Sequence, residues 1–262
     1  MSLHPTGNTG ISSLIIGIVG GVGPWAGLDL QRKILEQTVA ARDQDHLPVI
    51  AVSRPGPIPD RTEYLLGRVA ENPAMAMLEQ LRLLARAGAT VAGIPCNTAH
   101  APVIFDVIRA GVAECAPLRL LNLIEETAAH MTAHHPTLRT VGVLSTTGTW
   151  RTRLYPAALE PLGYRVVAPD ESMQEALVHP AIYDPDYGIK ATGAVTARAR
   201  ADLARAIVAL RERGAEAILL GCTELPPALP GREYEGIPLI DPTLALARAL
   251  VGAADPQRLR PW

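Results

Sequence analysis

Short apolar runs along the chain alternate with longer stretches in which apolar residues recur every three or four positions. The first run, residues 14–19, breaks into a glycine cluster, and a helical pattern follows over residues 25–40. This strand, turn and helix unit then recurs, which predicts a parallel sheet covered by helices. The strands predicted in the first half are 14–19, 49–52, 90–94 and 118–123, and its helices are 25–40, 73–87 and 99–110.

The second half of the chain repeats this plan. Apolar runs predict strands at 140–144, 164–168, 217–220 and 237–240, and an alanine- and arginine-rich stretch predicts a long helix over 192–213. We therefore expect an α/β fold of two pseudo-symmetric lobes, each a parallel sheet flanked by helices.

Two internal echoes relate the halves. AGATVAGIPCNTA in the first half matches GAEAILLGCTELP in the second, so Cys96 and Cys222 each end an equivalent strand. Residues 120–130 and 238–248 form the second echo, in which a strand runs into a helix, and we interpret them as the places where the chain crosses between lobes. The first lobe then comprises residues 14–123 plus 242–262, and the second comprises 124–241.

Ligands of open parallel sheets bind beyond the carboxyl ends of the strands. If the two lobes face each other, both cysteines lie in one cleft between them. Short polar residues follow each cysteine, in CNTAH and CTELP, before a predicted helix begins. A helix N-terminus stabilises a thiolate and lowers the pKa of the thiol, and its free N–H groups, with the hydroxyls of Thr98 and Thr223, can hold a carboxylate.

A carbon acid bound in that cleft would have one sulfur on each face. Racemisation needs this arrangement, because one base removes the α-proton while an acid on the opposite face delivers another. The alternative is that both cysteines are small buried core residues, as free cysteines often are. Their occurrence in matching strand, turn and helix contexts favours chemistry.

Composition narrows the function classes. The chain has 24 basic and 26 acidic residues and a formal charge of −2, so it has no overall basic field to attract nucleic acid or an anionic membrane. Its three cysteines form no CxxC pair or metal-ligand spacing, which favours reduced thiols and a cytoplasmic protein. Residues 1–13 lack the pattern of a signal peptide and are predicted to be a flexible extension, and no apolar run approaches the ~20 residues of a membrane span.

Six short motifs occur along the chain in a specific order. They are IGIVGGVGP at 16–24, IPDRT at 58–62, PCNTAH at 95–100, IEET at 124–127, STTGT at 145–149 and GCTEL at 221–225. With these motifs the chain resembles the aspartate/glutamate racemase family, and its aspartate racemase branch in particular. The resemblance covers nearly the whole chain.

The resemblance implies a two-thiol mechanism on a small amino-acid substrate, commonly in a homodimer, without pyridoxal phosphate, metal or nucleotide. Cys96 and Cys222 fall on the acid/base positions of the family. The residues that the resemblance assigns to the substrate's α-carboxylate and its surroundings are Asn97, Thr98, Thr223 and, in STTGT, Thr147. Arg61 and Lys190 match basic positions for a side-chain carboxylate, which would suit an arginine fork.

Two positions bear on which substrate is used. Many relatives have GMGP followed by a small or acidic residue, whereas this chain has Val22 and then Trp25, which could reshape the mouth of the cleft. Glu224 follows Cys222 and Thr223, as in aspartate racemases, where glutamate racemases usually have histidine.

Other functions compete with racemisation. Residues 21–26 also satisfy the G-x-G-x-x-G/A dinucleotide pattern, and Arg54 after the second strand could meet a 2′-phosphate, which would make the protein an NADP-dependent oxidoreductase. Against this, Pro24 lies within the turn, and the cysteine echo is left unexplained. Arylmalonate decarboxylases need one such cysteine, and isomerases of a small dicarboxylate such as maleate use two. A non-catalytic amino-acid-binding relative is a further alternative.

The remaining candidates have ordinary structural interpretations. His130, His134 and His135 lie near a predicted helix C-terminus without a zinc motif, and Cys115 has no counterpart in the second half. His100 is expected to support the Cys96 loop. Residues 183–188 form a loop, either a lid or an ordinary surface segment.

Overall fold

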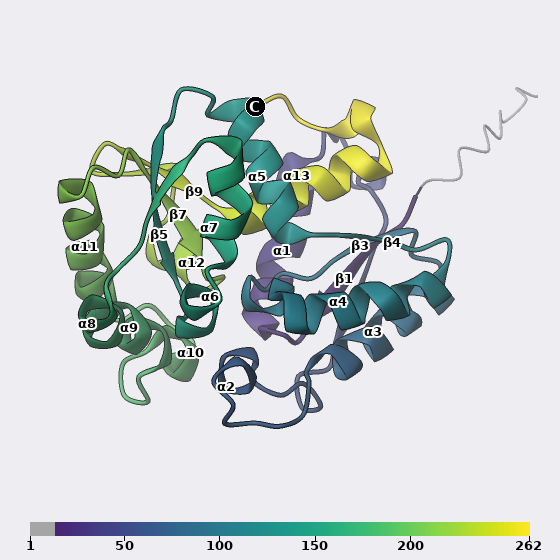
Figure 1. Ribbon diagram of the computed structural model, residues 1–262. Coiled ribbons are helices and arrows are strands. Elements are labelled where there is room, and N and C mark those ends of the chain that lie inside the picture. The colour runs from purple at the N-terminus through teal and green to yellow at the C-terminus, as the bar shows by residue number, and fades with distance from the viewer. Residues whose placement is uncertain (1–13) are drawn as a thin grey trace, which may run out of the picture.

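A computed structural model describes residues 14–262, and the extension predicted over residues 1–13 lies outside them. The chain forms two sheets whose neighbouring strands are parallel, apart from one short edge strand (Figure 1). The first sheet has the order β2-β1-β3-β4. Its strands are β1 (Ile16–Gly20), β2 (Val49–Ser53), β3 (Val91–Gly93) and β4 (Arg119–Leu121). The predicted α/β fold of two lobes is confirmed.

The second sheet has the order β6-β5-β7-β9-β8. Its strands are β5 (Thr140–Ser145), β6 (Arg165–Val167), β7 (Ala217–Gly221), β8 (Glu233–Tyr234) and β9 (Ile237–Ile240). The two-residue β8 was not predicted, and it pairs antiparallel with β9. The other four strands repeat the order of the first sheet, so β7 occupies the place of β3, as the echo around the two cysteines predicts.

Helices make three layers around the two sheets (Figure 1). Helices α3 and α4 cover the outer face of the first sheet, and α9 and α11 cover that of the second. Helices α1, α5, α7 and α13 lie between the sheets. The bounds are α1 (Pro24–Gln37), α2 (Arg61–Leu65), α3 (Ala74–Arg86), α4 (Pro102–Val112), α5 (Leu123–His134), α6 (Thr147–Arg151), α7 (Leu154–Leu159), α8 (Glu171–Met173), α9 (His179–Tyr183), α10 (Ile189–Thr192), α11 (Ala197–Glu212), α12 (Leu225–Ala228) and α13 (Pro242–Ala254).

The middle layer is one continuous apolar core. Ile16 and Ile18 of β1 face it from the first sheet, and Val141 and Val143 of β5 face it from the second. Leu144, the next residue of β5, packs into the outer core of its own lobe instead. Because successive residues of a strand point to opposite faces, both faces of each sheet are buried, which accounts for the nearly unbroken apolar runs in the sequence.

The two crossing segments have matching structures. Asn122 caps α5 by accepting hydrogen bonds from the backbone N–H groups of Ile124 and Glu125, and Asp241 caps α13 in the same way. Helix α13 follows β9 of the second sheet but packs on α1 and β3 of the first. Helix α5 follows β4 of the first sheet and packs on α7 and α13. The exact lobe limits at 123/124 and 241/242 stay a prediction.

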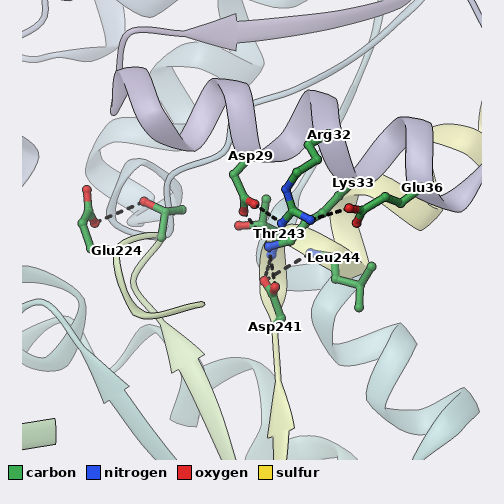
Figure 2. Close-up of polar contacts among 9 residues, drawn as sticks. Asp29, Arg32, Lys33, Glu36, Glu224, Asp241, Thr243 and Leu244 are labelled. Carbon is green, nitrogen blue, oxygen red and sulfur yellow. Dashed lines mark hydrogen bonds and ion pairs between the residues drawn. The ribbon is translucent and has the colours of Figure 1, made fainter. Parts of the chain in front are cut away.

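A buried lysine fastens α13 to α1 (Figure 2). Lys33 Nζ lies 2.5 Å from a carboxylate oxygen of Asp29, one turn earlier on α1, and 2.5 Å from Asp241 Oδ2. The other oxygen of Asp241 accepts the capping hydrogen bonds of α13. One carboxylate therefore both starts α13 and pairs with α1, which fixes the place where the chain returns to the first lobe.

Two predicted helices differ from the structure at their starts. The helix expected over 99–110 begins as a 3₁₀ turn at Thr98–His100, and α4 proper starts at Pro102. Proline suits the first turn of a helix because it has no N–H to donate. The helix expected over 192–213 begins only at Ala197, because Gly193 adopts a left-handed conformation (φ 63°) and Thr196 caps α11.

The glycine-rich turn after β1 has a packing explanation. Gly21 has φ 75°, and a Cβ there would lie 2.8 Å from the backbone nitrogen of Arg54. Both the backbone conformation and the close approach of the segment after β2 require glycine. Among residues 14–262, no helix is long and apolar enough to span a membrane.

Candidate active site

A small cavity lies where the two sheets face each other at the carboxyl ends of their strands. Its volume is about 10 Å³, room for about one water molecule. The residues that line it, which we call the catalytic cavity, are Val22, Arg61, Cys96, Asn97, Thr98, Thr146, Tyr183, Lys190, Cys222, Thr223 and Glu224. Seven of the eight residues assigned from the sequence are therefore together in one place.

The two cysteines reach this cavity from equivalent strands. Cys222 directly follows β7, whereas Cys96 lies three residues beyond the end of β3. Both are buried, and both are free thiols. Topology thus brings the two halves of the sequence echo to opposite sides of one cavity, one from each sheet.

Two buried hydrogen-bond donors in the cavity lining have no protein partner. Arg61 donates from Nη2 to the carbonyl of Val22 and from Nη1 to the carbonyl of Pro59, while its Nε is buried and unpaired. Asn97 accepts a hydrogen bond from Tyr155 at Oδ1, while its Nδ2 is buried and unpaired. Unpaired buried donors cost free energy. A ligand rich in acceptor oxygens, such as a carboxylate, would satisfy both.

The charge of Arg61 is held in place by its surroundings. Burial alone would lower the pKa of its guanidinium, but its interactions with Cys96, Asp60 and Tyr183 together outweigh burial and raise that pKa. Arg61 is therefore a fixed cation beside the Cys96 sulfur.

Cys222 has a different neighbour, the carboxylate of Glu224. The Cys222 thiol donates to Glu224 Oε2 over 2.8 Å, and Lys190 Nζ lies 2.5 Å from Oε1 of the same carboxylate. Burial lowers the pKa of Lys190, but the charge of Glu224, its hydrogen bond and the interactions with Cys222 and Tyr183 together outweigh burial and raise that pKa. Burial raises the pKa of Glu224, but the charge of Lys190 and the hydrogen bonds from Lys190 and Cys222 together outweigh burial and lower that pKa, so Lys190 and Glu224 form an ion pair.

One sequence expectation about the cysteines is wrong. A helix N-terminus was expected to lower the pKa of each thiol, but burial and then the charge of Glu224 raise the pKa of Cys222 well above its ordinary value. The helix α12 that follows Cys222 has only four residues and starts at Leu225, so its dipole is small.

Threonine hydroxyls surround the cavity, although one of them differs from the expectation. Thr98 Oγ1 lies 2.9 Å from the hydroxyls of Thr146 and Thr149, and Thr223 Oγ1 lies 3.2 Å from Glu224. Thr147 is not among the lining residues, and its hydroxyl contacts His179 Nδ1 at 3.0 Å. The neighbouring Thr146, also within the STTGT motif, faces the cavity instead.

Tyr183 also lines the cavity, and it was not predicted from the sequence. It ends α9, and its hydroxyl donates to Thr62 Oγ1 over 3.1 Å. It begins the segment interpreted as a lid or a surface loop. The one sequence signal that could have identified Tyr183 as a cavity residue is that it lies in the same polar segment as Lys190.

The expected support of the Cys96 loop by His100 is confirmed. The backbone N–H of Leu123 donates to His100 Nε2 over 3.2 Å, so the ring proton is on Nδ1, which donates to the carbonyl of Cys96 over 2.8 Å. The neutral ring thus links the Cys96 loop to the start of α5 through two hydrogen bonds. Burial lowers its pKa to about 4.

This low pKa predicts a loss of stability in acid. The unfolded chain takes up a proton on His100 near pH 6.5, whereas the folded chain does so only near pH 4, so the unfolded state binds more protons between these values and is favoured as the pH falls. We expect His100 to account for about 2 kcal/mol of unfolding free energy lost between about pH 7.5 and about pH 5. Urea unfolding of wild type and His100→Gln at both pH values measures it, and equal pH dependence in the two proteins would contradict it.

A larger open pocket adjoins the catalytic cavity. This vestibule has a volume of about 500 Å³ and shares Val22, Lys190, Thr223 and Glu224 with the cavity lining. Trp25, which is 71% exposed, lines the vestibule and not the catalytic cavity. The Lys190–Glu224 ion pair therefore lines both the catalytic cavity and an open, mostly apolar mouth.

The remaining histidines and the third cysteine lie elsewhere. His130 and His134 pack around Trp262 at the C-terminal end of α5, with ring centroids 4.5 and 4.8 Å from that of the indole. Burial, followed by the nearby histidine and arginine charges, lowers the pKa of His130 to about 3. Cys115 is buried in the core of the first lobe. We find no role for these residues in the catalytic cavity.

Comparison with known proteins identifies the family of the chain. The sequence profile of the family described as Asp/Glu/Hydantoin racemase matches residues 19–250. The broad-specificity amino-acid racemase RacX of Bacillus subtilis is 25% identical over an alignment of 244 residues that covers 90% of this chain and 96% of RacX.

Solved structures are similar over most of their length. The aspartate racemase of Picrophilus torridus is 30% identical, with a TM-score of 0.76 over 92% of this chain and 94% of that chain. The glutamate racemase of Francisella tularensis, solved with D-glutamate, has a TM-score of 0.68 over 96% of this chain and 85% of that chain. It is only 16% identical, so this second likeness concerns the fold alone.

Proposed function

Because the chain belongs to the Asp/Glu/Hydantoin racemase family and is a cofactor-independent amino-acid racemase, we propose that it interconverts the enantiomers of aspartate or a closely related acidic amino acid. Cys96 and Cys222 act as its two acid/base thiols. The observation that carries the proposal is that both sulfurs line one cavity together with two cations and one carboxylate.

The charges of the cavity are the inverse of those of aspartate. Arg61 and Lys190 are cations and Glu224 is an anion, whereas aspartate carries two carboxylates and one ammonium group. Apart from the catalytic thiolate, binding would therefore give each carboxylate of aspartate a cation and its ammonium group a carboxylate as partner, which buried charges require. A neutral amino acid would leave one cation unpaired, and a dicarboxylate such as maleate would bring no cation to meet Glu224.

The proposed reaction follows from this placement. One thiolate takes the α-proton, and the electron pair of the broken C–H bond spreads into the α-carboxylate, whose charge Asn97 Nδ2 and neighbouring hydroxyls stabilise. The thiol on the opposite face then gives its proton to the α-carbon. The two cysteines exchange roles for the other enantiomer.

Proton NMR tests the proposal directly. L-aspartate and, separately, D-aspartate are incubated in D₂O with the reduced protein and without added cofactor. We expect loss of the α-proton signal from both, together with formation of the opposite enantiomer, measured by chiral chromatography. Asparagine is the matched control because it replaces only the side-chain charge, and it should react far more slowly.

The alternatives give different results in the same assay. Conversion of maleate to fumarate without exchange of aspartate would replace racemisation by isomerisation of a dicarboxylate. Binding of aspartate by calorimetry with no exchange would indicate a non-catalytic relative. Equal rates for aspartate and asparagine would overturn the acidic specificity while leaving the thiol pair in place. A homodimer and a cytoplasmic location, which the resemblance implies, stay predictions.

A further inference from the structure

The two cysteines occupy equivalent places in the fold but have unlike surroundings. The Cys222 thiol donates to Glu224 Oε2 over 2.8 Å, and Lys190 and Thr223 hold that carboxylate in position. Cys96 instead lines the cavity together with the cationic Arg61. Among the described residues, Glu224 is the only carboxylate that lines the catalytic cavity.

These surroundings favour opposite protonation states. A carboxylate that accepts a hydrogen bond from a thiol stabilises the thiol form and repels the thiolate, whereas an adjacent guanidinium stabilises a thiolate. The other charged or titratable groups that act on Cys222 are Lys190 of α10, Tyr183 of α9 and Tyr155 of α7. Both tyrosines have raised pKa values because of burial and stay neutral, and Lys190 is paired with Glu224.

We infer that Glu224 is a positioning residue that keeps the resting proton on Cys222, so that the free enzyme holds Cys96 as its base. This inference rests on the proposed two-thiol racemisation and adds which of the two cysteines is the base in the free enzyme. The free enzyme is then ready for the enantiomer whose α-hydrogen faces Cys96. The other enantiomer reacts only with enzyme in which Cys96 carries the proton and Cys222 is the thiolate.

The proton balance of one turnover suggests a second role for Glu224, in returning the two cysteines to their resting protonation states. When the α-proton passes to Cys96 and the Cys222 proton passes to the α-carbon, Cys96 becomes a thiol and Cys222 a thiolate. The resting state returns only when Cys96 loses a proton and Cys222 gains one. Cys96 releases its proton to water, and Glu224, which lines both the catalytic cavity and the vestibule, can take up one proton from that water and pass it to the Cys222 sulfur, so that no net charge is gained or lost.

The chain allows a direct measurement because it has only three cysteines. Protein labelled with ¹³C at the cysteine Cβ gives three NMR signals, assigned with Cys96→Ala and Cys222→Ala, whose shifts follow ionisation of each thiol without any substrate. We expect Cys96 to ionise at lower pH than Cys222, by about one pH unit or more. In Glu224→Gln the Cys222 midpoint should fall by about one unit or more, with Cys96 and Cys115 almost unmoved.

A second variant keeps the test decisive if Glu224→Gln folds poorly, as judged by circular dichroism. Lys190→Met removes the charge that opposes Glu224, and it should move the Cys222 midpoint upward. Ionisation of Cys222 below Cys96 in the wild type, or a Cys222 midpoint that neither variant moves, would overturn the inference. These titrations need no turnover, so they fail or succeed independently of whether aspartate is the substrate.

Exchange kinetics provide the functional readout. Cys222→Ala, which retains Cys96, should exchange the α-hydrogen of one enantiomer in D₂O at neutral pH. Cys96→Ala, which retains Cys222, should exchange the opposite enantiomer only at higher pH, and adding Glu224→Gln should lower that pH. The same pH onset in the two single variants would contradict an asymmetric resting state.

Discussion

Replacing either Cys96 or Cys222 with alanine is expected to lower the racemisation of aspartate by about 10³-fold or more. Each substitution removes one of the two groups that must act on opposite faces of the α-carbon, and positioned acid/base groups contribute about 10²- to 10⁴-fold each. The remaining thiol can still remove and return a proton on its own face. Chiral chromatography should therefore show no inversion, while NMR in D₂O shows exchange of one enantiomer.

Cys115→Ala is the matched control, because Cys115 is equally buried but lies in the core of the first lobe. Its racemase activity should be nearly that of wild type, with at most a small loss of stability. Normal racemisation by both Cys96→Ala and Cys222→Ala would refute the two-thiol mechanism.

Changing Arg61 to lysine is expected to lower kcat/KM for aspartate by about 10- to 100-fold. Lysine keeps the positive charge but loses the planar fork, and with it the unpaired Nε that is available to a carboxylate. It also loses the two donors that fix the side chain to the carbonyls of Val22 and Pro59. Steady-state kinetics with both enantiomers measure the effect.

The choice of substrate separates two possible roles of Arg61. If Arg61 binds the side-chain carboxylate, the loss should fall on aspartate and leave the slow reaction of asparagine nearly unchanged. An equal loss for both substrates would show that Arg61 acts mainly on Cys96. Arg68→Lys, an exposed arginine on the surface, should change neither rate.

Much of the fold follows from the spacing of apolar residues. Strands buried on both faces give runs such as residues 140–144, and these are recognisable because nothing polar interrupts them. The short helices between β5 and α11 were not predicted, because helices of three to six residues have too few turns to show a period. Strand β8 has only two residues and carries no pattern.

The candidate site shows a similar division. The echo around Cys96 and Cys222 indicated a shared cavity, because equivalent strands place their carboxyl ends alike. Which threonine of STTGT faces the cavity depends on the backbone turn at the start of α6, where a shift of one residue rotates the hydroxyl away. The contact between Glu224 and Cys222 was also beyond prediction, because it needs a side chain that folds back onto the sulfur two residues earlier.

The exchange of helices across the middle layer bears on how such a molecule could be divided. Cut after α5, the N-terminal piece would keep the first sheet but lose α13, the helix that covers α1 and β3. The C-terminal piece would keep the second sheet but lose α5, which packs on α7. Neither half is a self-sufficient module: each completes the hydrophobic layer of the other, as in a domain-swapped dimer whose two subunits have been joined into one polypeptide.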